Sequence, residues 1–198
     1  MNARILAMIF ALVSIAVKVL GQESSLPKRY VDNDAYRIYD QLVPDEELWG
    51  NKTRIIQRET AKGQFLGMNI DSCVSPSVSH DFQAAIASFK TVNRKRWLLQ
   101  RQFELDRPYE LVASDVIKAV FTGTEQNNDG WQAFEEHFPG AGGYIVLSAV
   151  GFDRDKTHAV VFSGASCGSL CGSWSFHLFK KVRGEWKQVP GITCHTES

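Results

Sequence analysis

The chain has 198 residues, and its 22 lysines and arginines are balanced by 22 acidic residues. A formal net charge of zero argues against a dedicated nucleic-acid-binding protein, because such a protein needs a positive surface that pairs with phosphates. Hydrophobic residues make up 44% of the chain, which excludes a disordered protein, and the length suits one domain.

The N-terminus has the layout of a secretory signal peptide. Residues 5–17 are all apolar or small, with Arg4 before them and Lys18 after them. This run is shorter than the roughly 20 residues that a membrane-spanning helix needs. The pattern therefore predicts a signal peptide over residues 1–21, cleaved after Gly21, and an exported protein that is periplasmic or secreted. We expect no stable membrane anchor after cleavage.

Residues 22–34 are polar, and the sequence predicts a flexible segment there, followed by a single α+β domain over residues 35–198. Asp32 or Asp34 can cap a helix that ends before Pro44. In the rest of the first half, the spacing of apolar residues predicts helices over residues 81–91, 114–121 and 130–138 and strands over residues 53–60 and 97–105.

One basic cluster lies in this half of the chain. Arg94, Lys95 and Arg96 are consecutive, with Lys90 and Arg101 nearby. Acidic residues follow closely, so the sequence predicts a solvated surface turn rather than a phosphate-binding site.

After Gly143 the pattern changes to four strand-like runs, which are separated by short polar turns. The runs cover residues 144–152, 158–165, 174–182 and 185–189. Because short connections join antiparallel neighbours, they predict a four-stranded antiparallel meander. The expected fold class is α+β, with the N-terminal helices and a few short strands packed on one face of the meander.

Pairing these runs about their turns assigns their side chains to two faces. One face, with Ile145, Leu147 and Val160, is apolar and is expected to face the core. The other face is mixed, with hydroxyl groups beside the imidazole of His177. A shift of one residue in the register exchanges the two sets of side chains.

Ser163 and Ser175 lie on the same predicted face as His177, and a serine beside a histidine is part of a nucleophilic catalytic site. Such a site also needs a carboxylate that orients the imidazole and donors that stabilise an oxyanion, and the sequence identifies neither. A histidine that shares a structural hydrogen bond with a neighbouring hydroxyl group explains the same pattern. The sequence therefore favours a protein without enzymatic activity, and a small extracytoplasmic hydrolase that uses this pair is the alternative.

Aromatic residues on this face suggest a second kind of site. If they are exposed, Tyr144, Phe179 and Trp186 form a recognition patch. Cover by the N-terminal helices is the alternative and the commoner arrangement. The expected partner is a protein or a small ligand outside the cytoplasm, and we expect no nucleic acid.

The four cysteines all follow the predicted signal peptide, which favours disulfides in an exported protein. Four cysteines allow three pairings. Cys167 and Cys171 flank a predicted hairpin tip, where two strand ends come close enough for a bridge. Cys73 and Cys194 then form the second pair and tie the C-terminal tail to an early loop. The C-x-x-x-C spacing fits neither a zinc knuckle nor a thioredoxin-like redox site.

Other chemical motifs are weak. Residues 164–168, GASCG, match the nucleophile elbow of hydrolases, but that motif needs a helix after it and a strand is predicted here. The histidines lack metal-binding spacing, and no nucleotide-binding glycine pattern is present. We therefore expect no metal and no cofactor.

The C-terminal half resembles a family of uncharacterised exported bacterial proteins. The shared pattern is an S-x-V-G-F strand at 148–152, an AVVF strand at 159–162, a C-G-x-L-C-G tip at 167–172 and a final G-x-W at 184–186. No activity is established for such proteins. The resemblance implies bacterial export and one compact domain, and it assigns no catalytic or binding residue.

Overall fold

The structure is a computed structural model, and it describes residues 27–44, 49–63, 65, 67–122 and 130–197. The predicted signal peptide lies outside these residues. The helices are α1 (Asn33–Tyr39), α3 (Ile70–Cys73), α4 (Pro76–Val92), α5 (Ser114–Thr122) and α6 (Trp131–His137). The strands are β1 (Lys28–Arg29), β2 (Thr53–Gln57), β3 (Trp97–Leu98), β4 (Tyr109–Val112), β5 (Ala141–Leu147), β6 (Gly151–Phe152), β7 (His158–Gly168), β8 (Cys171–Val182), β9 (Glu185–Val189) and β10 (His195–Glu197).

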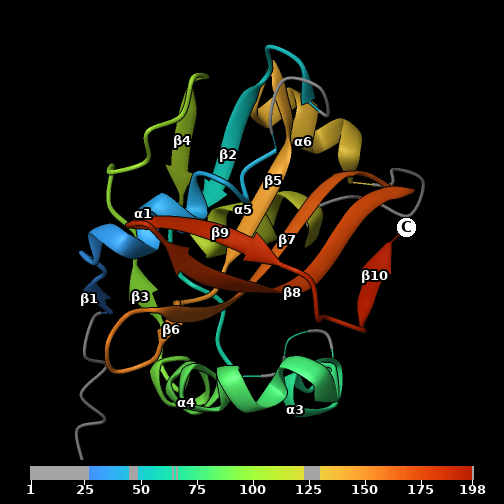
Figure 1. Cartoon of the computed structure of the whole chain (residues 1–198). Helices are drawn as coiled ribbons and strands as arrows, with labels where there is room; N and C mark the ends of the chain where they lie inside the picture. The colour runs from blue at the N-terminus through green and yellow to red at the C-terminus, as the bar shows by residue number, and fades with distance from the viewer. Residues whose placement is uncertain (1–26, 45–48, 64, 66, 123–129, 198) are drawn as a thin grey trace, which may run out of the picture.

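A large mixed sheet forms the centre of the molecule (Figure 1). Among the described residues it has eight strands, in the main order β10-β8-β7-β5-β2-β4, with β6 beside β7 and β9 beside β8. β5, β7, β8 and β9 pair in chain order, each antiparallel to the next, whereas β2 is parallel to both β4 and β5. The fold therefore combines helices and sheet, as the α+β class requires. Its sheet is wider than the four strands expected and is not purely antiparallel.

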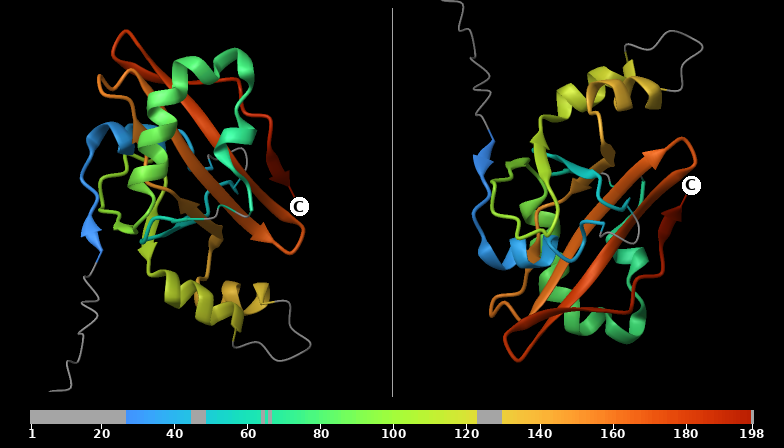
Figure 2. Two further views of the ribbon diagram at one scale, coloured as in Figure 1. Left: turned by 90° about the horizontal axis from the view of Figure 1, so that it is seen from below. Right: turned by 90° about the horizontal axis from the view of Figure 1, so that it is seen from above.

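Helices cover both faces of this sheet, whereas the sequence predicted them on one face (Figure 2). α1 packs against Val161 and Phe179 in one buried cluster. α4 packs against Val160 and Leu178, which point to the opposite face, and α5 and α6 cover the other end of that face around Tyr144. Both alternating sets of side chains in β7 and β8 are largely apolar, so each face needs a covering layer.

The register of β5 also differs from the prediction. Leu147 pairs with Ser163, and Ile145 pairs with Ala165. Ile145 and Leu147 therefore lie in the cluster covered by α1, and not with Val160 in the cluster covered by α4. An irregular segment that contains β6 joins β5 to β7, so no tight turn sets the register. A shift of the strand pairing by one residue moves every side chain of the strand to the other face.

Of the segment predicted to be flexible, residues 22–34, the structure describes residues 27–34, which contain β1 and the start of α1. β1 pairs with β3, and Tyr30 is buried, with its hydroxyl oxygen 2.9 Å from the N–H group of Val150 that donates to it. Asp32, one of the two predicted capping residues, caps α1. A single buried aromatic residue with a hydrogen-bonded hydroxyl group is enough to fix such a short polar segment.

Both predicted disulfides form. Cys167 and Cys171 bridge the tip of the β7–β8 hairpin, with their Cα atoms 5.1 Å apart. Cys73 and Cys194 are 121 positions apart in the sequence, with their Cα atoms 5.0 Å apart. The second bridge places the segment before β10 beside α3.

Candidate functional site

The structure brings Ser163 and His177 within hydrogen-bond distance. Oγ of Ser163 lies 2.8 Å from Nε2 of His177, and the side-chain amide nitrogen of Gln188 lies 3.3 Å from Nδ1. Ser175 does not join this contact, because its hydroxyl group donates to the carbonyl group of Phe176 at 2.9 Å. Of the two predicted serines, only Ser163 therefore contacts the imidazole.

The Ser163–His177 pair lacks parts that a nucleophilic site needs. Among the described residues, the hydrogen-bond partners of the imidazole are a hydroxyl group and an amide, so no carboxylate stabilises its protonated form. Burial lowers the pKa of His177 to about 4, which leaves the imidazole neutral and a weak base at pH 7. These features favour a structural hydrogen bond.

The aromatic residues expected in a recognition patch do not share one exposed surface. Phe179 is 0% exposed and Trp186 is 4% exposed, because α1 covers that face of the sheet. The indole N–H group of Trp186 also donates to Asp34 of α1 at 3.0 Å. Tyr144 is half-buried on the opposite face, beside Phe121 of α5. For Phe179 and Trp186 the structure therefore shows the alternative arrangement, cover by an N-terminal helix, and a recognition patch that includes them is excluded.

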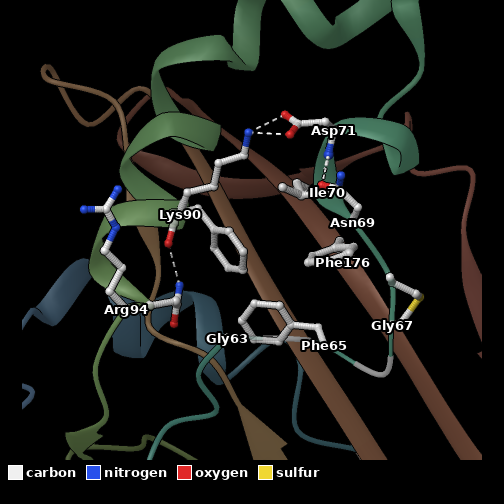
Figure 3. A pocket seen from close by; sticks show the side chains of 12 residues that line it. Gly63, Phe65, Gly67, Asn69, Ile70, Asp71, Lys90, Arg94 and Phe176 are labelled. Carbon is white, nitrogen blue, oxygen red and sulfur yellow. Dashed lines mark hydrogen bonds and ion pairs between the residues drawn. The ribbon is translucent and has the colours of Figure 1, made fainter.

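A pocket that the sequence did not predict lies between α3, the C-terminal half of α4 and β8 (Figure 3). It has a volume of about 510 Å³. Aromatic side chains and two cations contribute to its lining, and these are Phe65, Phe89, Phe176, Lys90 and Arg94.

α4 is fixed to the sheet at the end that lines the pocket. The helix begins with Pro76, whose missing N–H group costs nothing in a first turn, and Asn93 caps its C-terminus. The buried amide of Asn93 donates to the carbonyl oxygen of Ala149 and accepts from its N–H group, both at 2.9 Å. Gly151 packs so closely that a Cβ atom there would lie 2.3 Å from Cα of Phe89. These contacts fix the helix end that carries Lys90.

α3 forms the opposite wall. Asn69 caps this short helix, because its side-chain oxygen accepts a hydrogen bond from the N–H group of Asp71 at 3.1 Å. The disulfide between Cys73 and Cys194 holds the other end, and the N–H group of Thr193 donates to the carbonyl oxygen of Cys73 at 2.8 Å. A helix of one turn is unstable alone, so these tertiary contacts keep the wall in place.

The edge of the pocket carries positive charge. Nζ of Lys90 lies 2.6 Å from Oδ1 of Asp71, across the gap between the two helices (Figure 3). Both side chains are about half exposed, and such a surface ion pair contributes at most about 1 kcal/mol, so a bound anion can replace Asp71. Within the part of the chain that the structure describes, the guanidinium group of Arg94 has no hydrogen bond or ion pair. Lys90 is therefore the cation at the gap between the two helices, whereas Arg94 lies at the border of the pocket and its side chain points away from the rings (Figure 3).

The sequence predicted Lys90 and Arg94 to be part of a solvated turn. The available signal is the position of Lys90 next to Phe89, which is an apolar position of the helix together with Ile86, whereas Arg94 follows the C-cap Asn93 and lies outside the helix. No local pattern indicates that α3 lies opposite them.

Comparison of the chain with protein-family models, with curated proteins and with solved structures found no match. Within the described residues, no group of three or more His, Cys, Asp or Glu side chains is placed to hold a metal ion. None of the helices described here is long and apolar enough to cross a membrane.

Proposed function

We propose that this protein is an exported binding domain, and that the pocket between α3 and α4 binds a small anion with an aromatic or other apolar body. The observation that carries the proposal is the position of Lys90 at the edge of a pocket lined by Phe65, Phe89 and Phe176, with Arg94 at its border. A mostly apolar pocket with a few charged groups is the usual form of a small-molecule site.

Export is supported by two features of the chain. The N-terminal residues 1–21 have the layout of a signal peptide, and all four cysteines are paired. Disulfides persist in oxidising compartments, which favours the periplasm or the cell exterior. Removal of residues 1–21 takes Arg4 and Lys18 away and leaves 20 basic and 22 acidic residues, so nucleic acid remains an unsuitable partner.

The charged and apolar parts of the pocket select different parts of the ligand. The floor of the pocket is the edge of the buried cluster that contains Phe65, Phe89 and Phe176, and Met68 adds to its apolar lining, which favours an apolar ligand body. Lys90 supplies a cation once the anion replaces Asp71, and the guanidinium group of Arg94 can pair with the two oxygens of a carboxylate after its side chain turns toward the pocket. We therefore expect tight binding only when a ligand carries both parts.

The probe that tests this expectation is 3-phenylpropionate, measured by isothermal titration calorimetry. It should bind at least about tenfold more tightly than 3-phenylpropanol, which lacks the charge, or propionate, which lacks the ring. Arg94→Gln should weaken its binding about tenfold, because a hydrogen bond to a charged group contributes about 1.5–3 kcal/mol.

Arg154→Gln is the matched control for Arg94→Gln. It removes the same charge from an exposed turn, and Arg154 does not line the pocket. Its affinity for 3-phenylpropionate should equal that of the unchanged protein. Equal losses in the two variants, or no binding of the probe at all, would contradict the proposed function.

Hydrolysis by Ser163 is the alternative function, and the 2.8 Å contact with His177 is the observation that supports it. Because this imidazole has no carboxylate partner among the described residues, we expect a fluorophosphonate probe to leave Ser163 unmodified. Intact-protein mass spectrometry measures the outcome. A mass increase that Ser163→Ala abolishes would establish the nucleophile and overturn this expectation.

A further inference from the structure

A second pocket, with different chemistry, lies between α1 and the segment of residues 101–104. Its volume is about 460 Å³. The lining from α1 consists of Asn33, Tyr36, Arg37 and Asp40, which share one side of the helix, and the opposite wall consists of Arg101, Gln102, Phe103 and Glu104. The pocket therefore contains two carboxylates and two guanidinium groups.

Among the residues that the structure describes, the carboxylate of Asp40 has no cation paired with it. It is half-buried, and Oδ1 accepts a hydrogen bond from the N–H group of Glu104 at 3.1 Å. Among the described residues it forms no ion pair, although Arg37 lies one turn earlier on the same helix. The carboxylate of Glu104 adds further negative charge at this end of the pocket.

The guanidinium group of Arg37 is also without a counter-ion in the described part of the chain. The other cation of the pocket, Arg101, lies against the ring of Tyr109 and donates to its carbonyl oxygen at 3.3 Å. Opposite charges thus line the same pocket without forming ion pairs with one another. A ligand that carries both signs of charge would complement them.

We propose that this second pocket binds a small zwitterion, with the ammonium group of the ligand at Asp40 and Glu104 and its carboxylate at Arg37 and Arg101. An ammonium group supplies the cation that Asp40 lacks, and a carboxylate accepts from the guanidinium groups in a planar geometry. Gln102 adds an uncharged side chain that can donate or accept at the same wall.

The titration of Asp40 gives the proposed site a pH dependence. Burial raises the pKa of Asp40 to about 6, a change that the N–H group of Glu104 opposes and the Glu104 carboxylate increases. Tyr36, which lines the same pocket, stays neutral in this range because burial raises its pKa to about 12. Protonation of Asp40 removes the charge that attracts the ammonium group, so affinity should fall as the pH drops below about 6.

Calorimetry with 4-aminobutyrate tests this site, with butyrate and butylamine as probes that each carry one of its two charges. At pH 7.5, 4-aminobutyrate should bind at least about fivefold more tightly than either, because it alone pairs with both ends of the pocket. Asp40→Asn and Arg37→Gln should each lower the affinity for 4-aminobutyrate about tenfold. Asp40→Asn keeps an oxygen acceptor for the N–H group of Glu104, so the local fold is retained.

Asp155→Asn and Arg154→Gln are the matched controls, because they remove the same charges from an exposed turn outside the pocket. Both should bind 4-aminobutyrate as the unchanged protein does. Lowering the pH to 5 should weaken binding roughly tenfold in the unchanged protein and leave Asp40→Asn unaffected. The proposal would be overturned if Asp40→Asn bound 4-aminobutyrate as tightly as the unchanged protein does. It would also be overturned if butyrate or butylamine bound as tightly as 4-aminobutyrate, or if 4-aminobutyrate did not bind.

Discussion

Replacement of both Cys73 and Cys194 by alanine is expected to lower the free energy of unfolding by about 4 to 5 kcal/mol. The disulfide joins positions that are 121 residues apart, so its loss restores a large amount of conformational freedom to the unfolded chain. It also holds α3 at the wall of the first pocket. Urea unfolding followed by circular dichroism measures the change.

The tip disulfide provides the control, because alanine at Cys167 and Cys171 removes the same number of sulfur atoms. These residues are only 4 positions apart, and the same relation between loop length and entropy gives a loss of about 2 kcal/mol. A loss at the tip equal to or larger than that at Cys73 and Cys194 would contradict this account of what stabilises the fold.

Gly151→Ala is expected to destabilise the protein by about 3 kcal/mol, because overpacking a well-filled contact carries this order of cost. A Cβ atom at position 151 would lie 2.3 Å from both N and Cα of Phe89, and these backbone atoms belong to α4. The helix can accommodate the methyl group only by moving away from the sheet. Urea unfolding should show the loss as a lower midpoint.

Gly168→Ala is the matched change in the same sheet. A Cβ atom there meets nothing closer than Cβ of Cys171 at 3.5 Å, which is ordinary contact. Its free energy of unfolding should stay within about 0.5 kcal/mol of that of the unchanged protein. Similar effects of the two substitutions would show that α4 does not pack at Gly151 as described.

Several elements followed from local pattern alone. The helix predicted over residues 114–121 is observed at Ser114–Thr122, and Asp32 was recognised as a candidate cap. α4 begins five residues before the predicted start at residue 81, because the polar first turn after Pro76 lacks the apolar spacing that marks the rest of the helix. Local rules identify amphipathic segments well and their polar ends poorly.

The register of β5 and the cover of the sheet depended on long-range contacts. Alternation in β5 is apolar on both sides, so sequence pattern alone did not decide whether Ile145 faces α1 or α4. Phe179 and Trp186 looked suitable for recognition because nothing in their own strands shows that α1 packs over them. The register difference arose because an irregular segment with β6 stands where a short turn was expected, and the cover of Phe179 and Trp186 depends on a helix that is distant in sequence.

Neither candidate pocket was visible in the sequence, for a related reason. Asp71 and Lys90 are brought together by the packing of α3 on α4, and Asp40 and Glu104 meet only because the segment 101–104 runs beside α1. Charged residues at such positions look like ordinary solvated surface when each is considered with its neighbours in the chain. Their significance depends on the partner wall, which is distant in sequence.

The most direct test of the proposed function is a titration of the exported protein with 3-phenylpropionate, followed by ¹H–¹⁵N NMR spectroscopy. The largest shifts are expected in the backbone amides of residues 67–71, 89, 90, 93 and 94, which line the pocket between α3 and α4. The dissociation constant obtained from these shifts should equal the one found by calorimetry, and it should be larger for Arg94→Gln. The largest shifts elsewhere on the molecule, or no saturable shifts, would contradict the proposed function.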